Sequence, residues 1–390
     1  MIEEGEMLSM ISNLLKSLYL FIVKIRSDIT FKKHEKVIFL LSFPATSGIV
    51  IEAIYNEWGK NLIICYTSEA SGLAYEYKKK GCIIYHIDSF KTLIHRVVPL
   101  VTTAKVVLCD NYFAFLGSIH SSNDREIVQI WHANGAIKYF GLEARYTQNR
   151  SKTDQNRYKR VYEKFTHYIV SSDKMSEIFT RNYQVTINTL PFGYPMTDNY
   201  FDPDWIHEKK NLFKQNFPTS KKVLLYAPTY REENSKITNK FNKIVDDLQE
   251  DWIILVKPHP HEEGKYRSLN HEDKMFLDFK GLSLTEILPS VDCLITDYSS
   301  IPFEYSLANT NGRVIFYCYD FLEYDRMVGI EKDFKEWAPG DIVFDEKCLL
   351  EAINAEKETS FDKFNADWNQ FANGTSRKKI IEWVRNKNES

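Results

Sequence analysis

The sequence predicts an α/β protein built from two doubly wound, Rossmann-like domains, and three observations lead to this expectation. From residue 37 onward, short apolar runs alternate with longer amphipathic stretches, which is typical of a mostly parallel sheet covered by helices on both faces. A turn-rich segment from Leu190 to Asp198 interrupts this alternation, and a second series then begins. With 390 residues, the chain is also longer than one hydrophobic core usually requires.

Composition excludes several other classes of protein. The chain is 44% hydrophobic and 26% charged, which indicates a globular fold without long disordered tracts. A net charge of -3 argues against nucleic acid as a partner, so local groups must meet any anionic ligand. The six cysteines are widely spaced without a CxxC pair, which favours reduced thiols over a zinc site or disulfides. No secretory signal or membrane-spanning stretch is apparent.

Residues 1–36 form a basic segment in front of the first domain. Apolar residues recur at helical spacing between Ile11 and Ile25, and residues 16–36 hold six Lys or Arg against two acids. This pattern predicts an amphipathic basic helix, which could pack on the first domain or lie in an anionic membrane surface. Residues 141–160 have the same excess of four positive charges, six against two.

We expect the first domain to cover residues 37–190 and the second to cover 191–375, followed by a C-terminal helix at 376–390. The predicted strands of the first domain are 37–43, 62–66, 82–86, 105–109, 127–131 and 168–170, with helices near 47–58, 70–80, 89–99, 156–165 and 173–181. Those of the second domain are 222–226, 252–256, 275–277, 291–295 and 313–317. Two such sheets would face each other across a cleft at their carboxyl edges. The chain has no GxGxxG or GxxxxGK[ST] loop, which disfavours a dinucleotide dehydrogenase or a P-loop enzyme.

One predicted strand of the second domain ends in a candidate phosphate site. The strand at 291–295 runs into Asp297, Ser299 and Ser300, and then into a helix with Pro302 in its first turn. Free backbone N–H groups, the positive end of the helix dipole and two hydroxyls together suit a phosphate. Asp297 or Ser299 could equally do no more than cap the helix.

Two further strands of this domain end in polar residues. The strand at 252–256 runs into Lys257, Pro258, His259, Pro260 and His261, where the prolines stiffen the turn and a cation and an imidazole suit a diphosphate; an ordinary turn is the alternative. The strand at 222–226 runs into Pro228, Thr229 and Arg231. Three polar strand ends in one domain predict a nucleotide-diphosphate site. Asp202 and Asp204 have DxD spacing but lie in a turn-prone stretch, so we expect neither a metal nor a cofactor.

In the first domain, the strand at 127–131 runs into His132, followed by the small residues of the segment 133–136. A histidine at a strand end, opposite the phosphate-type motifs, is a candidate general base at the domain cleft. A lone histidine is more often structural, so its position carries this assignment.

These motifs, in this order, resemble those of the CDP-glycerol glycerophosphotransferase family of Gram-positive wall teichoic acid synthesis. They read WHANGAIK at 131–138, FGLE at 140–143, YAPTYR at 226–231, KPHP at 257–260 and ITDYSS at 295–300. The resemblance extends over roughly residues 37 to 345, and the compact length resembles the priming members more than the longer polymerases. It implies a GT-B-type fold, CDP-glycerol held mainly by the C-terminal domain, and peripheral attachment to the cytoplasmic face of the membrane.

The resemblance also implies roles for individual residues. His132 matches the family's base, with Ala133, Asn134, Gly135 and Ala136 as the adjacent loop. The implied CDP-glycerol contacts are Pro228, Thr229, Lys257, Pro258, His259, Ser299, Ser300 and Glu304, and Arg231 and Asp297 complete the expected site. Three positions depart from the family pattern: Glu304 stands where Asp is frequent, GYPM at 193–196 lacks the family's arginine, and PGD at 339–341 replaces PGP.

The expected reaction moves glycerol phosphate from CDP-glycerol to a hydroxyl of an undecaprenyl-diphosphate-linked disaccharide and releases CMP. His132 would take the acceptor's proton, while His259, Lys257 and the helix start would neutralise the diphosphate. Alternatives are a poly(glycerol phosphate) or poly(ribitol phosphate) polymerase, a nucleotide-sugar glycosyltransferase, and a membrane-docked nucleotide-diphosphate sensor without activity. An anionic membrane surface and other wall teichoic acid enzymes are the further candidate partners.

Overall fold

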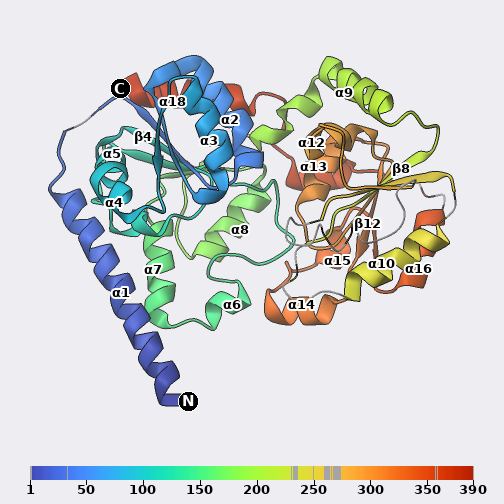
Figure 1. Ribbon diagram of the computed structural model, residues 1–390, viewed down its shortest axis with the longest axis horizontal. Helices are drawn as coiled ribbons and strands as arrows, with labels where there is room; N and C mark the ends of the chain where they lie inside the picture. The colour runs from blue at the N-terminus through green and yellow to red at the C-terminus, as the bar shows by residue number, and fades with distance from the viewer. Residues whose placement is uncertain are drawn as a thin grey trace.

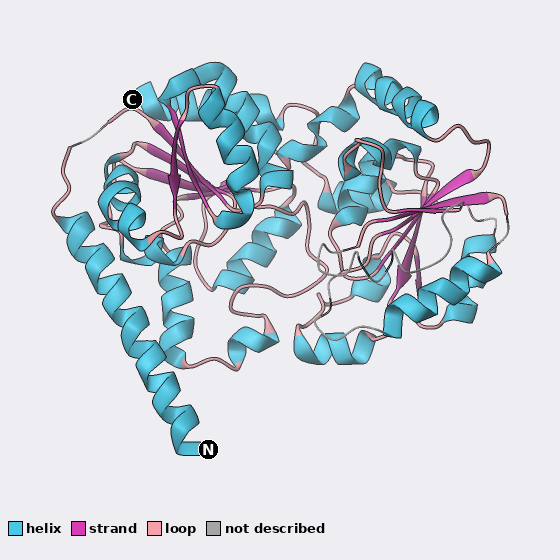
Figure 2. Ribbon diagram, in the orientation of Figure 1, coloured by secondary structure: helices cyan, strands magenta, loops and turns pink. Residues whose placement is uncertain are grey.

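The computed structural model describes residues 2–32, 34–229, 231, 236–248, 250–258, 264, 266, 274–355, 357 and 359–389. Within these residues the chain forms two sheets, each of parallel strands. The sheets lie side by side, with helices on both faces of each (Figures 1 and 2). This arrangement confirms the predicted fold class.

The first sheet has the strand order β3-β2-β1-β4-β5-β6-β7, and every described pair is parallel. Its strands are β1 (Val37–Leu41), β2 (Leu62–Tyr66), β3 (Ile83–His86), β4 (Val106–Cys109), β5 (Glu126–Gln129), β6 (His167–Ile169) and β7 (Thr189–Leu190). The helices around it are α2 (Pro44–Trp58), α3 (Ser71–Lys79), α4 (Phe90–Thr92), α5 (Val98–Thr103), α6 (Arg145–Gln148), α7 (Lys152–Tyr162) and α8 (Asp173–Tyr183), together with the 3-10 helix η4 (Ala114–Ser118). The strands β1, β2 and β4 are buried along their whole length, which explains their unbroken apolar runs.

The second sheet repeats this order as β10-β9-β8-β11-β12-β13, again with parallel pairs. Its strands are β8 (Lys222–Tyr226), β9 (Trp252–Val256), β10 (Met275–Phe276), β11 (Cys293–Thr296), β12 (Arg313–Tyr317) and β13 (Asp341–Val343). Its helices are α9 (Pro203–Asn216), α10 (Lys236–Asp247), α12 (Leu284–Ile287), α13 (Ile301–Ala308), α14 (Phe321–Met327), α15 (Phe334–Trp337), α16 (Glu346–Asn354) and α17 (Asp362–Trp368). The strands β7 and β13 were not predicted; they lie directly beside the turn-forming residues Pro191 and Gly340.

The strand order reverses between β1 and β4 in the first sheet, and between β8 and β11 in the second. In open α/β sheets, ligands bind outside the carboxyl ends of the strands at such a reversal. The segments that follow these four strands, together with the segment after β5, are therefore where the fold places a site.

The N-terminal helix α1 (Ile2–Asp28) packs with its carboxyl half against η4 and α5, and its other end extends away from the first domain (Figure 1). Val23 and Ser27 are buried in that contact. Farther toward the N-terminus the docked side is polar, because Lys16 pairs with Asp154 of α7 at 3.1 Å and Arg157 donates to Asn13 and Ser17. The helix thus docks through these polar contacts together with Tyr19, Ile22 and Val23. It leaves a row of apolar residues, the apolar stripe, in solvent: Ile11, Leu14, Leu15, Leu18, Phe21 and Ile25.

The C-terminal helix α18 (Ser376–Glu389) returns to the first domain and packs on α2. Arg385 pairs with Glu57 of α2, and Lys387 contacts Glu126 of β5 at 2.7 Å. Among the described helices, none has the length and apolar character that crossing a membrane would require. All six cysteines are unpaired and five are buried, whereas Cys348 is exposed.

Candidate active site

A cavity of about 710 Å³ lies between the two domains at the carboxyl edges of both sheets. The first domain contributes Phe43 after β1, Asn111 after β4 and the segment from Trp131 to Gly141 after β5. The second domain contributes Thr229 after β8 and Ser299 and Ser300 after β11. The cavity therefore joins the predicted base to two of the three predicted phosphate-binding strand ends.

His132 is held in one orientation by the backbone. Its Nδ1 lies 2.8 Å from the carbonyl oxygen of Asp110, and a carbonyl can only accept, so Nδ1 carries the proton of the neutral ring. The lone pair of the neutral imidazole is consequently on Nε2. Burial lowers the pKa of His132 to about 4, opposed by the hydrogen bond to Asp110 and assisted by the charge of Lys138. His132 is therefore neutral at pH 7 and able to accept a proton.

Aromatic packing fixes the imidazole plane. His132 stacks on Phe43 with 3.8 Å between ring centroids and an interplanar angle of 18°. The preceding residue, Trp131, has a φ of 63°, a left-handed conformation that costs a non-glycine residue about 1–2 kcal/mol. Such strain persists only where surrounding structure imposes it, and here it turns the chain at the point where it enters the cleft.

Asp110 holds His132 directly through its carbonyl and indirectly through the turn that carries Phe43. Its carboxylate accepts hydrogen bonds from the backbone N–H groups of Ser42 and Phe43, at 2.8–2.9 Å, and from the Ser47 hydroxyl at 2.8 Å. Burial raises the pKa of Asp110 to about 6, against the opposing effect of these hydrogen bonds. The same residue thus fixes the Phe43 turn with its side chain and the His132 ring with its carbonyl.

The loop after His132 both lines the cavity and contacts the second domain. Asn134 is buried and donates to Asn369 at 2.7 Å, and Asn369 in turn donates to the carbonyl of Phe303 on α13. A Cβ atom at Gly135 would lie 2.5 Å from the Phe303 ring, so only glycine permits this approach. Ala133, Gly135 and Ala136 line the cavity, whereas Asn134 does not.

In the second domain, Arg231 and Asp297 form a buried ion-pair network. Asp297 accepts hydrogen bonds from the Thr229 backbone N–H at 2.8 Å and from the Thr229 hydroxyl at 2.6 Å. Arg231 lies 3.0 Å from Asp297 and 2.8 Å from Asp320, and these carboxylates raise its pKa against the effect of burial. Both residues therefore hold the strand-end loops in place, with Thr229 presented to the cavity.

The start of α13 lies open to the cavity. Ser300 occupies the N-cap position without a side-chain cap hydrogen bond, and Ser299 accepts only a long one, 3.3 Å, from the Ile301 N–H. Capping hydrogen bonds therefore use little of the hydrogen-bonding capacity of these two hydroxyls. Glu304, one turn farther on, lies close enough to Tyr194 and Tyr200 to act on them electrostatically, and burial raises its pKa to about 7.

The strand end after β9 is described only in part. Lys257 is exposed and Pro258 is buried, and neither they nor Pro228 line the cavity. His259 and His261 lie outside the described residues.

Lys138 is a cleft residue to which the sequence analysis assigned no role. Its exposed side chain lines the cavity, and desolvation lowers its pKa, with Asp297 opposing and Arg231 adding to this effect. Lys138 lies close enough to both His132 and Asp297 to interact with them electrostatically. The signal for it was its place six residues after His132 in the same quoted motif.

Asp202 serves α9, because its carboxylate caps that helix by accepting from the Asp204 and Trp205 N–H groups. Within the described residues, no group of three or more His, Cys, Asp or Glu side chains is placed to hold a metal ion.

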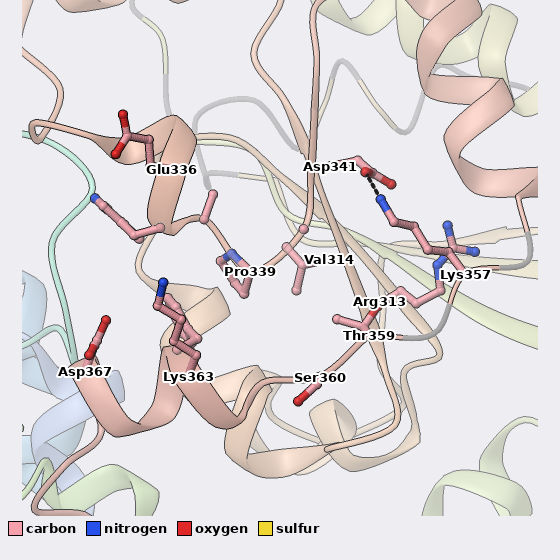
Figure 3. A pocket seen from close by; sticks show the side chains of 14 residues that line it. Arg313, Val314, Glu336, Pro339, Asp341, Lys357, Thr359, Ser360, Lys363 and Asp367 are labelled. Carbon is pink, nitrogen blue, oxygen red and sulfur yellow. Dashed lines mark hydrogen bonds and ion pairs between the residues drawn. The ribbon is translucent and has the colours of Figure 1, made fainter.

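A second hollow, of about 350 Å³, lies at the opposite, amino edge of the second sheet (Figure 3). Lys357 pairs with Asp341 there, as the dashed line in Figure 3 shows, and Arg313 donates to the carbonyls at the end of α16. These charges have partners within the protein, and no residue predicted for the site lies there.

Two Rossmann-like domains with strand ends that face a shared cleft define a GT-B-type fold. The model of the family described as CDP-Glycerol:Poly(glycerophosphate) glycerophosphotransferase matches residues 27–386. The chain therefore belongs to this family and is a glycerophosphotransferase of that kind.

Curated relatives include the teichoic acid glycerol-phosphate primase of Bacillus subtilis strain 168, which is 30% identical over 387 residues, or 96% of this chain and 99% of that protein. The glycerol-phosphate primase of Staphylococcus aureus is 27% identical, and the match covers 95% of this chain and 98% of that protein. The poly(glycerol phosphate) polymerase of Bacillus subtilis is 28% identical over 283 residues, or 66% of this chain and 37% of the polymerase.

Solved structures show the same fold. The wall teichoic acid polymerase TagF superposes with a TM-score of 0.73 at 18% identity, covering 97% of this chain and 98% of that one. UDP-GlcNAc 2-epimerase from Neisseria meningitidis superposes with a TM-score of 0.60 at 11% identity, covering 90% and 100% of the two chains.

Proposed function

We propose that this enzyme transfers glycerol phosphate from CDP-glycerol to a hydroxyl of an undecaprenyl-diphosphate-linked disaccharide. The acceptor oxygen forms a bond to the β-phosphorus, and the bond from that phosphorus to the bridging oxygen breaks. CMP leaves with the electron pair, and the acceptor's proton passes to His132 Nε2. The observation that carries this proposal is the fixed tautomer of His132 in a cavity shared with the start of α13.

The length of the match favours a primase over a polymerase. Glycerol-phosphate primases align with this chain over nearly their whole length. The match to the poly(glycerol phosphate) polymerase covers only 37% of the polymerase's length. We therefore propose one transfer per acceptor rather than chain extension.

The donor's diphosphate would lie between Lys138 and the start of α13. Ser299 and Ser300 present hydroxyls there, beside Thr229, whose own hydroxyl is bonded to Asp297, and the first N–H groups of α13 present partial positive charge. Lys257 and His259 belong to the same proposed donor site, and Pro228 and Pro258 shape their turns. A bound diphosphate would also raise the pKa of His132 toward neutrality, because a nearby negative charge favours the imidazolium. Positioning and charge neutralisation would then supply most of the rate gain, without a cofactor.

The test is to incubate the enzyme with CDP-glycerol and a short-chain disaccharide-diphosphate lipid, and to identify products by mass spectrometry. We expect one added glycerol phosphate and one equivalent of CMP. A ladder of products would establish a polymerase, and turnover of nucleotide sugars instead of CDP-glycerol would establish a glycosyltransferase. Absence of CMP release with every acceptor would favour a sensor.

We also propose that the enzyme attaches peripherally to the anionic cytoplasmic face of the membrane through α1, near other wall teichoic acid enzymes. The apolar stripe includes Leu14 and Phe21, which are 69% and 58% exposed, and basic residues such as Lys24 and Lys152 are exposed nearby on α1 and α7. An exposed apolar row flanked by cations is typical of a helix that lies in a membrane interface.

Replacing Leu14, Leu15 and Leu18 by Gln tests this attachment. We expect weaker sedimentation with anionic vesicles, unchanged melting temperature and unchanged turnover of a water-soluble acceptor analogue, because the docking contacts of Lys16 and Val23 remain. Full vesicle binding by the triple variant would remove α1 as the membrane contact.

A further inference from the structure

The cavity continues beyond His132 into the first domain, and this part has aromatic walls. We call it the aromatic half; its lining residues are Tyr112, Phe140, Tyr146, Tyr158, Tyr162 and Tyr183. Tyr298 and Tyr324 of the second domain line the same cavity, and Tyr146 lies close enough to Tyr324 to interact with it electrostatically, but all six residues of the aromatic half belong to the first domain. The donor residues proposed above contribute nothing to it.

The floor of the aromatic half is rigidly packed and its rim is open. Tyr162 stacks on Tyr183 with 3.9 Å between ring centroids. The ring centroid of Tyr112 lies 5.3 Å from that of Tyr158 and 5.9 Å from that of Tyr162. At the rim, Tyr146 on α6 is 52% exposed. The phenol oxygens of Tyr112, Tyr146 and Tyr158 make no hydrogen bond to another residue in the described part of the chain.

Flat rings with hydroxyls that lack protein partners suit a ligand that is apolar on its faces and polar around its edge. A pyranose ring has this character, because its C–H groups form apolar faces and its hydroxyls project from the rim. Tyrosine is well suited to it, since each ring offers a stacking surface and one hydroxyl at low entropic cost.

The position of α1 indicates where a lipid attached to such sugars would lie. Tyr158 is on α7, and the neighbouring Asp154 and Arg157 of α7 hold α1. Tyr19 of α1 lies close enough to Tyr112 to interact with it electrostatically. The aromatic half therefore lies beside the helix that carries the apolar stripe.

We propose that the aromatic half is the carbohydrate subsite for the acceptor, in which Tyr146 and Tyr158 contact the sugar rings of a lipid-diphosphate-linked disaccharide. The subsite places a sugar hydroxyl at His132, with the lipid running toward α1. This inference rests on the proposed function for the identity of the sugar, and it adds the residues that select it.

Calorimetric titration of a short-chain disaccharide-diphosphate lipid against the full-length protein tests the subsite without relying on turnover. Tyr146→Ala and Tyr158→Ala should each weaken binding of this analogue about tenfold, as loss of an aromatic stacking surface does elsewhere. CDP-glycerol affinity should stay within about twofold. Tyr146→Phe should retain most of the affinity, since it keeps the ring. Tyr75→Ala, which removes a similarly exposed tyrosine on α3, should change neither affinity.

Unchanged affinity for the analogue in both alanine variants would overturn the subsite, and so would a wild-type protein that does not bind the analogue. Loss of CDP-glycerol affinity in Tyr146→Ala would also overturn it, by assigning the aromatic half to the donor's base. Because Tyr146 is exposed, its variant keeps the test valid even if Tyr158→Ala fails to fold. If the variants weaken analogue binding while the wild type forms no product, the subsite stands and the proposed reaction falls.

Discussion

The chemistry of His132 follows from two contacts that involve Asp110. The carbonyl of Asp110 fixes the tautomer, and its carboxylate fixes the turn that carries Phe43 against the imidazole. Neither contact transfers a proton to substrate, so Asp110 is a positioning residue. The free enzyme has a neutral imidazole, with a pKa lowered to about 4 by burial.

His132→Ala should reduce turnover by roughly 10²–10⁴-fold, which is the usual contribution of a positioned general base. CDP-glycerol affinity should remain within about twofold, because His132 faces the acceptor. His207→Ala, which removes an exposed histidine on α9, is the matched control and should change neither quantity. Single-turnover rates and calorimetry measure both. Wild-type turnover in His132→Ala would exclude it from the mechanism.

The pH profile of the wild type tests the same residue. In the free enzyme His132 gains a proton only as the pH falls toward about 4, so the acid limb of kcat/KM should lie well below pH 6.5. The acid limb of kcat should lie at higher pH, because the bound diphosphate raises the pKa of the imidazole. Both limbs should be missing from the residual activity of His132→Ala.

The raised pKa of Glu304 leads to a separate prediction, on how the free energy of unfolding depends on pH. Burial raises its pKa from 4.5 to about 7, so the folded protein binds its proton more tightly than the unfolded chain does. Its contribution to stability is therefore fully present below pH 4.5 and is lost as the pH rises through about 7. Urea unfolding at several pH values should show wild type losing stability relative to Glu304→Gln over this window. The exposed pair-forming residue Glu382, changed to Gln, should show no such trend.

At the scale of elements, α13 and α1 each present an unusual surface. The first turn of α13 faces the cavity with two serine hydroxyls that capping scarcely uses. Helix α1 docks through polar side chains and a few apolar ones such as Val23, and it leaves its apolar stripe exposed. Both arrangements are the reverse of what stability alone favours, and such exceptions are expected where an element meets a ligand or a surface.

Replacing Ser299 and Ser300 by Ala should weaken CDP-glycerol binding by roughly 1.5–3 kcal/mol for each charge-assisted hydrogen bond lost. Stability should fall by less than the ~1 kcal/mol typical of a lost cap, because only the 3.3 Å bond of Ser299 is removed. Asp345→Ala deletes the cap of α16 in the same domain and should lower stability without affecting the donor. An unchanged CDP-glycerol affinity with a lowered melting temperature would make both serines structural.

At the scale of the whole molecule, the segment 137–145 of the first domain forms hydrogen bonds to the second domain. The backbone N–H of Tyr139 donates to Gly329 at 2.9 Å, that of Glu331 donates to Ile137 at 2.7 Å, and Arg181 of α8 pairs with the Glu331 carboxylate. Together with the Asn134–Asn369 contact, these bonds set the position of His132 relative to α13. The distance between His132 and the start of α13 is therefore fixed by contacts between the domains and not by either domain alone.

Gly135→Ala should disturb this contact, because the added methyl would meet the Phe303 ring at 2.5 Å. We expect a loss of about 1–3 kcal/mol in stability, typical of overpacking, together with reduced turnover. Phe303→Leu in the same protein should restore part of both. Gly72→Ala, a helical position with open space around it, is the control and should be neutral or slightly stabilising. Thermal melting and turnover assays decide, and full activity of Gly135→Ala would show that the loop can move.

The sequence by itself determined the two-sheet fold, the family, and the strand ends that surround the cleft. Buried parallel strands are unbroken apolar runs, and the motifs that follow them are local in sequence, so both can be recognised without coordinates. The strands β7 and β13 were not recognised because the turn-forming residues Pro191 and Gly340 beside them indicate loops.

Only the tertiary structure decided which of these residues share the cleft. Arg231 and Asp297 pair with each other, Asn134 holds Asn369, and Asp110, Lys138 and the aromatic half surround His132. The same holds for the side on which α1 docks and for the return of α18 to the first domain. These outcomes depend on side chains more than a hundred residues apart, or on which of several polar groups finds a partner when buried, and no local pattern encodes either.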